Sequence, residues 1–361
     1  MKIAKSGFDN LPLSLVNRLS SSEQDFFNSL KWFENFIETI TKPMGNDVCF
    51  YYDADSQLPI ILPLMFDVEN SLRKINSLTN YYSPIYSILG NQTDISEQSI
   101  KDFFISLKKE LPGWDIMELR PLAFEESALL VKQLKKAAMP SVSFFCFGNW
   151  YENINGRSFK NYFSGLSSQV KNTVTRKTKK FFQLEGARVE IITTEDELAK
   201  GLAAYQQVYE SSWKVQEPYP EFMPGLMKQA ASIDGLRLGI AYLGDQAIAA
   251  QFWIVADNTA YIFKLAYDEN YKQHSAGTIL TTKLMEYVID VDKVGVVDYL
   301  CGDDAYKKDW MSNRRERWGV LVFNTSTVRG CIEYAKEMSK FFIKAVFNYF
   351  KISRNRPANE G

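Results

Sequence analysis

Residue types that build metal centres and disulfides are scarce in this chain. Among 361 residues there is one histidine, His274, and there are four cysteines, none in a CxxC pair. Structural and catalytic zinc sites draw on closely spaced Cys and His, so we expect no metal. The cysteines lie far apart and mostly in apolar stretches, which is typical of free thiols in a reducing compartment. A cytoplasmic protein is therefore expected.

Long hydrophobic runs and an excess of one charge are also absent. No apolar stretch approaches the roughly 20 residues of a membrane-spanning helix, and the start, MKIAKSGFDNLPLSL, has no signal-peptide core. Lys and Arg number 42 against 43 Asp and Glu, which gives a net charge of −1. Such a chain has no overall attraction to DNA or to anionic lipid. We expect neither an integral membrane protein nor a DNA-binding protein.

The chain is instead rich in hydrophobic and aromatic residues, which follow two successive patterns of helices and strands. The chain is 46% hydrophobic and 14% aromatic, and its length favours two domains. Hydrophobic periodicity predicts a first α/β domain over 1–150, with a helix over 22–41, a strand pair over 48–67, and later helices over 96–110 and 125–138. The stretch 78–89 is predicted to be loop plus strand.

After a polar connection, the pattern restarts. The second domain, 151–361, is predicted to contain a basic helix over 166–184, three antiparallel strands over 236–268, and a terminal amphipathic helix over 330–350. We expect the terminal helix to pack on the core or between the domains, with dimerisation or contact with a membrane surface as alternatives. Oligomeric state is left open between monomer and homodimer.

The segment 261–310 carries the strongest functional signal. It is predicted to be a strand (YIFKLAYDENY), a loop (KQHSAG), a helix (TILTTKLMEYVIDV), a second strand (VGVVDYLC) and a charged turn (GDDAYKKDW). A loop that ends in glycine at a helix start presents backbone N–H groups and the positive end of the helix dipole. The pattern thus predicts a phosphate cradle beside titratable side chains.

These pieces resemble a known family. The basic helix SSQVKNTVTRKTKK, the strands from GIAYLGDQ to KQHSAGTIL, and the GDDAYKKDW turn are similar to the GNAT acyltransferase superfamily. The similar branch is the CelD-like proteins associated with polysaccharide biosynthesis, which are related to the Fem-type aminoacyltransferases. FFNSLKWFENF and NYYSPIYSIL look like the first half of that branch. The resemblance implies a tandem of two GNAT-like α/β domains, each a mixed, mostly antiparallel sheet flanked by helices.

The resemblance also implies an acyl-CoA (acetyl-CoA) donor site in the second domain. The pyrophosphate would meet the loop and helix start, and the pantetheine arm would run along the preceding strand, which splays from the strand over 296–301. The residues implied are Leu265, Ala266, Gln273, Ala276, Gly277, Thr278 and Ile279. The family's loop often has a Gln or Arg and two glycine-type positions, whereas this chain keeps the Gln and a single glycine. An acyl carrier protein or an aminoacyl-tRNA is therefore an alternative donor.

Catalytic roles are implied for the charged turn. Tyr306 takes the place of the tyrosine that many GNAT enzymes use as the general acid toward the leaving thiolate. Asp303 and Asp304 are candidates to accept the proton of an incoming ammonium, or simply to lie at a helix start. His274 is the only imidazole that could act as a general base. It lies in the loop, where we expect it to be exposed to solvent or near a phosphate. Cys301 offers a covalent route.

Two further groups of residues are candidates for binding. Tyr51, Tyr81, Tyr82 and Trp213 are expected in an acceptor cleft between the domains or in the core. A basic helix face is either solvated or meets an anionic partner, and its residues are Lys171, Arg176, Lys177, Lys179 and Lys180.

Three functional hypotheses follow. The first is a GNAT-type N-acyltransferase that moves an acyl group from acyl-CoA to a small amine, such as an amino sugar or a cell-envelope precursor. The second is a Fem-like transferase that depends on aminoacyl-tRNA, or one that depends on an acyl carrier protein. The third is a non-catalytic binding protein of the same fold.

Overall fold

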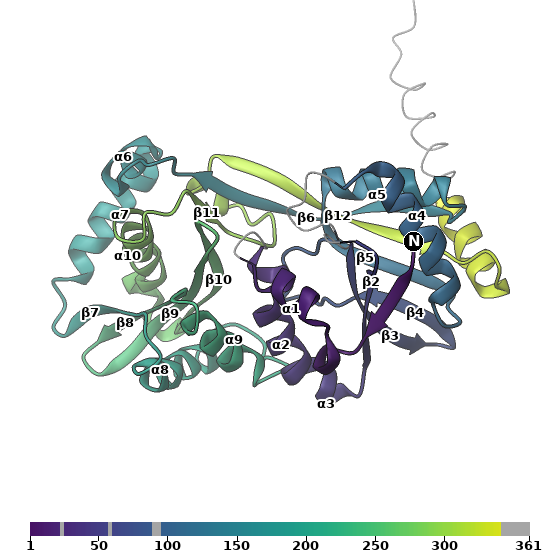
Figure 1. The fold of residues 1–361 in the computed structure, drawn as a ribbon. Coiled ribbons are helices and arrows are strands. Elements are labelled where there is room, and N and C mark those ends of the chain that lie inside the picture. Colours follow the sequence, from purple (N-terminus) through teal and green to yellow (C-terminus); the bar gives the residue numbers. More distant parts are fainter. Residues whose placement is uncertain (22–24, 57–59, 89–94, 341–361) are drawn as a thin grey trace, which may run out of the picture.

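The computed structural model describes residues 1–21, 25–56, 60–88 and 95–340. Its strands form one sheet in the order β1-β2-β3-β4-β5-β12-β6-β11-β10-β9-β8-β7 (Figure 1). Their bounds are Ile3–Ser6 (β1), Asp47–Asp53 (β2), Ile61–Glu69 (β3), Leu72–Ser77 (β4), Ile116–Ala123 (β5), Ser141–Asn153 (β6), Ala187–Ile192 (β7), Leu236–Leu243 (β8), Gln246–Ala256 (β9), Thr259–Tyr267 (β10), Val296–Asp298 (β11) and Asn313–Phe323 (β12). Neighbours are antiparallel except β4 with β5 and β10 with β11. The expected α/β class is confirmed.

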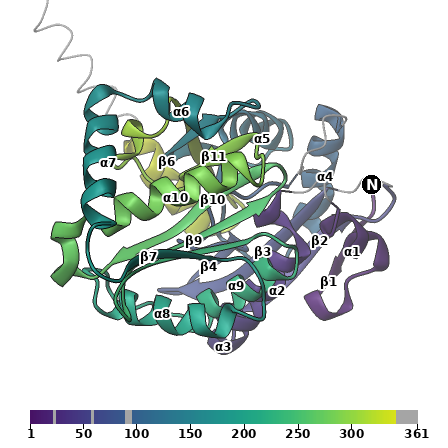
Figure 2. The same ribbon diagram turned by 90° about the vertical axis from the view of Figure 1, so that its left-hand side faces the viewer.

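Helices cover both faces of this sheet. The labelled α-helices are Leu13–Leu19 (α1), Leu30–Phe36 (α2), Lys42–Met44 (α3), Glu97–Glu110 (α4), Phe124–Lys136 (α5), Phe159–Gly165 (α6), Ser168–Phe181 (α7), Leu198–Glu210 (α8), Phe222–Ala231 (α9) and Ala276–Asp290 (α10), and a further helix runs over the described residues 328–340. Figure 2 shows α10, α6 and α7 on one face of the C-terminal half, with α8 and α9 on the other. Each parallel strand pair is connected through a helix, α4 in one half and α10 in the other.

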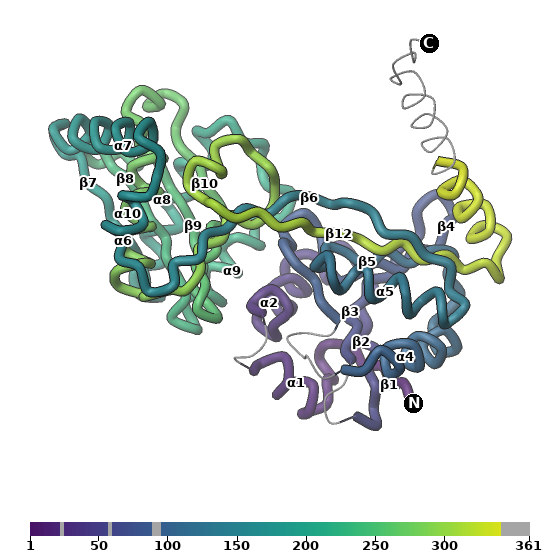
Figure 3. Tube along the Cα trace, turned by 90° about the horizontal axis from the view of Figure 1, so that it is seen from above, coloured from purple at the N-terminus to yellow at the C-terminus, as the bar shows by residue number. Residues whose placement is uncertain are grey.

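Two long strands join the halves of the molecule. The first part of β6 pairs with β12, and its last residues pair with β11. β12, although late in the chain, lies between β5 and β6 (Figure 3). The sheet is therefore continuous from one half to the other. A domain division near residue 150 stays a prediction.

The halves also share a hydrophobic core. Trp32 on α2 and Phe222 on α9 lie edge to face with ring centroids 5.7 Å apart, and Tyr82 stacks on Phe222 at 4.1 Å. All three side chains are buried. Aromatic pairs of this kind add to the stabilisation from burial alone. The relative position of the halves is fixed by packing as well as by the sheet.

The predicted strands and the terminal helix agree with the structure to different extents. The strand pair over 48–67 and the three antiparallel strands over 236–268 are confirmed. The strand expected within 78–89 is wrong for the described part, which has turns and bends to residue 88; residue 89 lies outside it. Of the helix over 330–350, residues 330–340 are helical and 341–350 fall outside the described residues.

The early helix over 22–41 is shorter at its start than expected. Residues 22–24 lie outside the described part, and a 3-10 turn capped by Asp25 precedes Ser29, which caps α2. Both side chains accept backbone N–H groups, so two caps in succession separate the turn from the helix.

Candidate functional site

The separation of β10 from β11 opens a cleft in the C-terminal half. The two strands pair only over Thr259–Tyr261 and Val296–Asp298. Beyond Tyr261, β10 has no partner on that side among the described residues, because β11 ends at Asp298. A pocket of about 630 Å³ lies there. Its lining comes from both halves and consists of Tyr81, Tyr82, Trp213, Lys214, Gln251, Ile262, Phe263, Lys264, Leu265, Ala266, Tyr267, Gly277, Thr278, Thr281, Tyr299, Leu300, Cys301, Asp304, Tyr306, Lys307 and Trp310.

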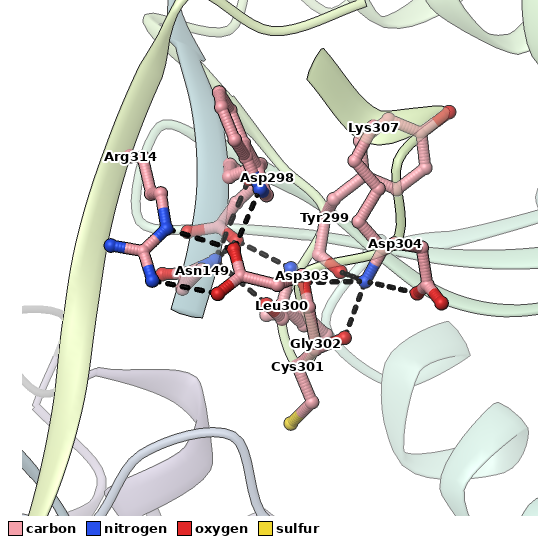
Figure 4. A network of polar contacts seen from close by, with 11 residues as sticks. Asn149, Asp298, Tyr299, Leu300, Cys301, Gly302, Asp303, Asp304, Lys307 and Arg314 are labelled. Atoms are coloured by element: carbon pink, nitrogen blue, oxygen red, sulfur yellow. Dashed lines mark hydrogen bonds and ion pairs between the residues drawn. The ribbon is translucent and has the colours of Figure 1, made fainter. Parts of the chain in front are cut away.

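The chain leaves the sheet at a tightly bonded turn after β11. The buried carboxylate of Asp298 accepts hydrogen bonds from the side chain of Asn149 and the backbone N–H of Leu300, each at 2.6 Å (Figure 4). Leu300 has a left-handed backbone, with φ of 54°. This conformation is rare for a branched residue and is held here by the hydrogen bonds. The turn directly follows Asp298, the last residue of β11 that pairs with β10.

A buried lysine holds the same turn from the other side. Lys307 is 4% exposed. Its ammonium donates to the carbonyl oxygens of Tyr299, Cys301 and Gly302, and it lies 3.3 Å from the Asp304 carboxylate. Buried charges need such partners. Lys307 is therefore committed to the shape of the turn, although it also borders the pocket.

The two acidic candidates are used differently. Asp303 accepts two hydrogen bonds from Arg314 and one from the indole of Trp150. The Arg314 hydrogen bonds lower the pKa of Asp303 below its ordinary value. Asp303 does not line the pocket, whereas Asp304 does. Of the two carboxylates, the structure thus brings Asp304 to the cleft, and its side chain is 60% exposed although it lies near Lys307.

Tyr306 lies on the cleft wall beside Asp304. Burial, and to a lesser extent the Asp304 charge, raises the pKa of its phenol to about 12. The phenol is therefore protonated at neutral pH. Burial also raises the pKa of the Cys301 thiol to about 12, and because the thiolate is the reactive form, this argues against covalent catalysis by Cys301.

The start of α10 forms one end of the cleft. Ser275 precedes it with φ of 56° and makes no side-chain cap. The backbone N–H groups of Ala276, Gly277 and Thr278 have no acceptor among the described residues, as expected at an uncapped helix start. Gly277 and Thr278 line the pocket together with Leu265 and Ala266 of β10.

Other candidate residues lie elsewhere. The side chains of Ala276 and Ile279 are buried in the core under α10. Gln273 is exposed and contacts His274 at 3.2 Å, and neither lines the pocket. Tyr51 packs in the core of the N-terminal half. Of the four aromatic residues expected in a cleft, Tyr81, Tyr82 and Trp213 meet there.

Sequence reasoning missed a cluster around Glu217. Its carboxylate accepts hydrogen bonds from Tyr81, Tyr82 and Tyr209 and pairs with Lys264 of β10 at 2.7 Å. Burial raises the pKa of Glu217, but the hydrogen bonds outweigh burial and lower the pKa overall. The cluster joins the two halves at the cleft wall. Its residues come from three separate segments, so no sequence motif could have revealed it.

Comparisons with known proteins agree with this geometry. Residues 168–308 match the family model of the acetyltransferase (GNAT) domain. No curated protein sequence matches the chain significantly. Among solved structures, FemX superposes with a TM-score of 0.59 at 10% identity, covering 89% of this chain and 97% of FemX.

Two more solved structures share the fold. A conserved protein of unknown function from Bacteroides thetaiotaomicron has a TM-score of 0.57 at 10% identity, with coverage of 90% of this chain and 100% of its own. The C-terminal domain (DUF2156) of a putative lysylphosphatidylglycerol synthetase from Agrobacterium fabrum gives 0.51 at 10% identity, with 84% and 90%. The GNAT resemblance is confirmed for residues 168–308, which are similar to the acetyltransferase (GNAT) domain, and the solved structures show that the fold is shared over most of the chain.

Proposed function

We propose that the protein is an N-acyltransferase that moves an acyl group from a CoA thioester to the amine of a small acceptor. One observation carries the proposal. The cleft between β10 and β11 ends at the start of α10, where three N–H groups have no acceptor among the described residues, and this start lies inside the segment that matches the GNAT domain. A cleft with an anion-binding end suits a long thioester donor with a pyrophosphate.

The residues present fit such a donor. The N–H groups of Ala276, Gly277 and Thr278 would hold the pyrophosphate. Leu265 and Ala266 would lie along the pantetheine arm, because β10 is unpaired on the cleft side past Tyr261 among the described residues. Bound CoA supplies the thioester as the activated acyl group.

Chemistry at the cleft would use the charged turn and the free edge of β10. Backbone N–H groups on that edge are suited to polarise a carbonyl oxygen, as oxyanion-hole donors do. Tyr306 keeps its proton and can donate it, or a hydrogen bond, to sulfur. Asp304 can bind an incoming ammonium and relay its proton to water. Asp303 would act only by holding the turn.

The acceptor side is aromatic and lies at the junction of the halves. Tyr81, Tyr82 and Trp213 line it, and faces of this kind suit the apolar side of a sugar ring. We favour an amino sugar or a cell-envelope precursor as the acceptor. A cytoplasmic location stays a prediction; no helix in the described residues is long and apolar enough to cross a membrane.

Calorimetric titration with acetyl-CoA tests the donor directly. Binding heat and a raised melting temperature are expected, followed by thiol release when a panel of amino sugars is added. Binding without release to any amine would favour a non-catalytic binding protein. The absence of heat and of thermal stabilisation would contradict a CoA-dependent transferase.

One observation favours the second candidate, a transferase fed by aminoacyl-tRNA or an acyl carrier protein. The side chains of Arg176, Lys177, Lys179 and Lys180 on α7 have no ion-pair partner in the part of the chain that the structure describes. The same helix contacts the 3-10 turn Glu269–His274 before α10. A polyanionic donor would bind there with steep salt dependence. Reversing two of these charges should abolish that binding and leave acetyl-CoA binding intact.

A further inference from the structure

Three lysines line the cleft, and they differ in their partners. Lys264 is paired with Glu217 at 2.7 Å, and Lys307 is held by backbone carbonyls. The ammonium of Lys214 has no hydrogen-bond or ion-pair partner among the described residues. It lies 5.8 Å from the ring centroids of Tyr209 and Trp213. A half-buried cleft lysine with no hydrogen-bond or ion-pair partner in the described part of the chain needs an explanation, because charges removed from water are normally paired.

The loop that carries Lys214 is anchored on the donor wall. The Trp213 ring lies 4.4 Å from that of Tyr267 at the end of β10. Tyr267 in turn stands next to Gly277, where an added Cβ would lie 3.7 Å from its ring. The backbone N–H of Lys214 donates to the Ser212 hydroxyl. The loop that carries Lys214 is thus packed, through Trp213, against the end of β10, and Lys214 lines the pocket.

The charges that face Lys214 come from every side of the cleft. Lys264 faces it from β10, Glu217 from its own loop and Asp304 from the turn after β11. Burial, reinforced by the positive charge of Lys264, lowers the pKa of Lys214 to about 8, and the two carboxylates only partly oppose this. The free-amine fraction at neutral pH is roughly two orders of magnitude above that of an ordinary lysine.

We infer that the Lys214 amine occupies the place of the acceptor amine in the cleft and takes the acyl group from a bound acyl thioester when no acceptor is present. The inference rests on the proposed function. The nitrogen lone pair forms a bond to the acyl carbon, the carbon–sulfur bond breaks, and the thiolate takes up the proton that nitrogen releases. The products are an amide on Lys214 and a free thiol. The amide removes the one cleft ammonium that lacks a partner among the described residues.

Incubation of the full-length protein with acetyl-CoA alone, followed by peptide mass mapping, tests this. Acetylation of Lys214 is expected to saturate with acetyl-CoA, to be slowed by CoA, and to exceed that of exposed Lys179 at least tenfold. Its rate should fall about tenfold for each pH unit below 8. Lys264 and Lys307 should remain unmodified. In Lys214→Arg this modification should be lost, because the guanidinium stays charged and has no free amine to take the acyl group.

The outcomes are separable. Binding heat with acetyl-CoA but no preferential acetylation of Lys214 would overturn this inference and leave the proposed function standing. If, in addition, Lys214→Met weakened CoA binding tenfold, the amine would be a phosphate ligand and not a nucleophile. If neither binding heat nor acetylation is observed, the proposed function and this inference are both overturned.

Discussion

Asp303 and Arg314 form a two-point ion pair, in which the guanidinium donates to both carboxylate oxygens at 2.8 and 2.6 Å. Arg314 belongs to β12, so the pair fastens the turn after β11 to the strand that crosses between the halves (Figure 4). Planar two-point pairs fix direction as well as distance. The turn beside the cleft is thereby coupled to β12, one of the two strands that join the halves.

Asp303→Asn is expected to lower kcat roughly tenfold without moving the pH profile, because the residue positions the turn and accepts no proton. Its pKa is already lowered by Arg314, so it stays ionised above about pH 4. Steady-state rates from pH 6 to 9 are the measurement. Arg314→Lys keeps the charge but loses the planar pair of N–H donors, so its kcat should fall by a similar factor. A shifted pH profile would restore Asp303 as a base.

Tyr306→Phe should reduce kcat by about 10²-fold and leave acetyl-CoA affinity within a factor of two, since proton donation by a placed side chain contributes in this range. With a pKa of about 12, wild-type activity should show no decline from Tyr306 ionisation below pH 10. Tyr287→Phe on α10, outside the pocket lining, is the matched control. Unchanged turnover in Tyr306→Phe would remove the role given to this phenol.

Gly277→Ala separates ligand binding from folding. An added Cβ would make an ordinary contact with Tyr267 at 3.7 Å, and alanine favours a helix over glycine. Stability should be unchanged or slightly higher, while acetyl-CoA affinity should fall about tenfold because the methyl group obstructs close approach to the N–H groups. Gly165→Ala, where a Cβ meets open space, should change neither quantity. Equal affinity in both variants would contradict the cradle.

Glu217→Gln should lower the free energy of unfolding by about 2 kcal/mol, because the amide keeps its oxygen as an acceptor but loses the charge, and one hydrogen bond to a charged group contributes roughly this much. The pKa of Glu217 is lowered by its partners, so its contribution is present above about pH 4.3 and is lost as the pH falls below that value. Denaturant titrations at pH 7 and pH 3 should show a difference that shrinks in acid. The exposed Glu221→Gln is the control, and an equal loss there would count against the cluster.

Local pattern predicted the second half well. The alternation in β8, β9 and β10 and the polar turns between them indicated antiparallel strands, and short-range periodicity is enough for such hairpins. The helix start at Gly277 was also readable, because its signal lies within a few residues. The split of β10 from β11 followed from the family resemblance.

Long-range assembly was not readable. Glu217 meets Tyr81 and Tyr82 across 135 or more residues of sequence, and no spacing rule connects them. Asp303 and Asp304 are adjacent residues of the same type, so the sequence alone assigns them no different roles. Arg314 on β12 and Trp150 on β6 bind Asp303 and give it a structural role, whereas Asp304 lines the cleft.

The position of β12 has a consequence for how the protein is made. β12 fills the space between β5 and β6, so the sheet of the first half remains incomplete until residue 323 has emerged from the ribosome. Until then, both strands present unpaired edges, which are prone to join other chains. A fragment ending near residue 150 should therefore aggregate, and its solubility should be restored by supplying 313–323 as a peptide. The late strand makes the folding of the two halves interdependent.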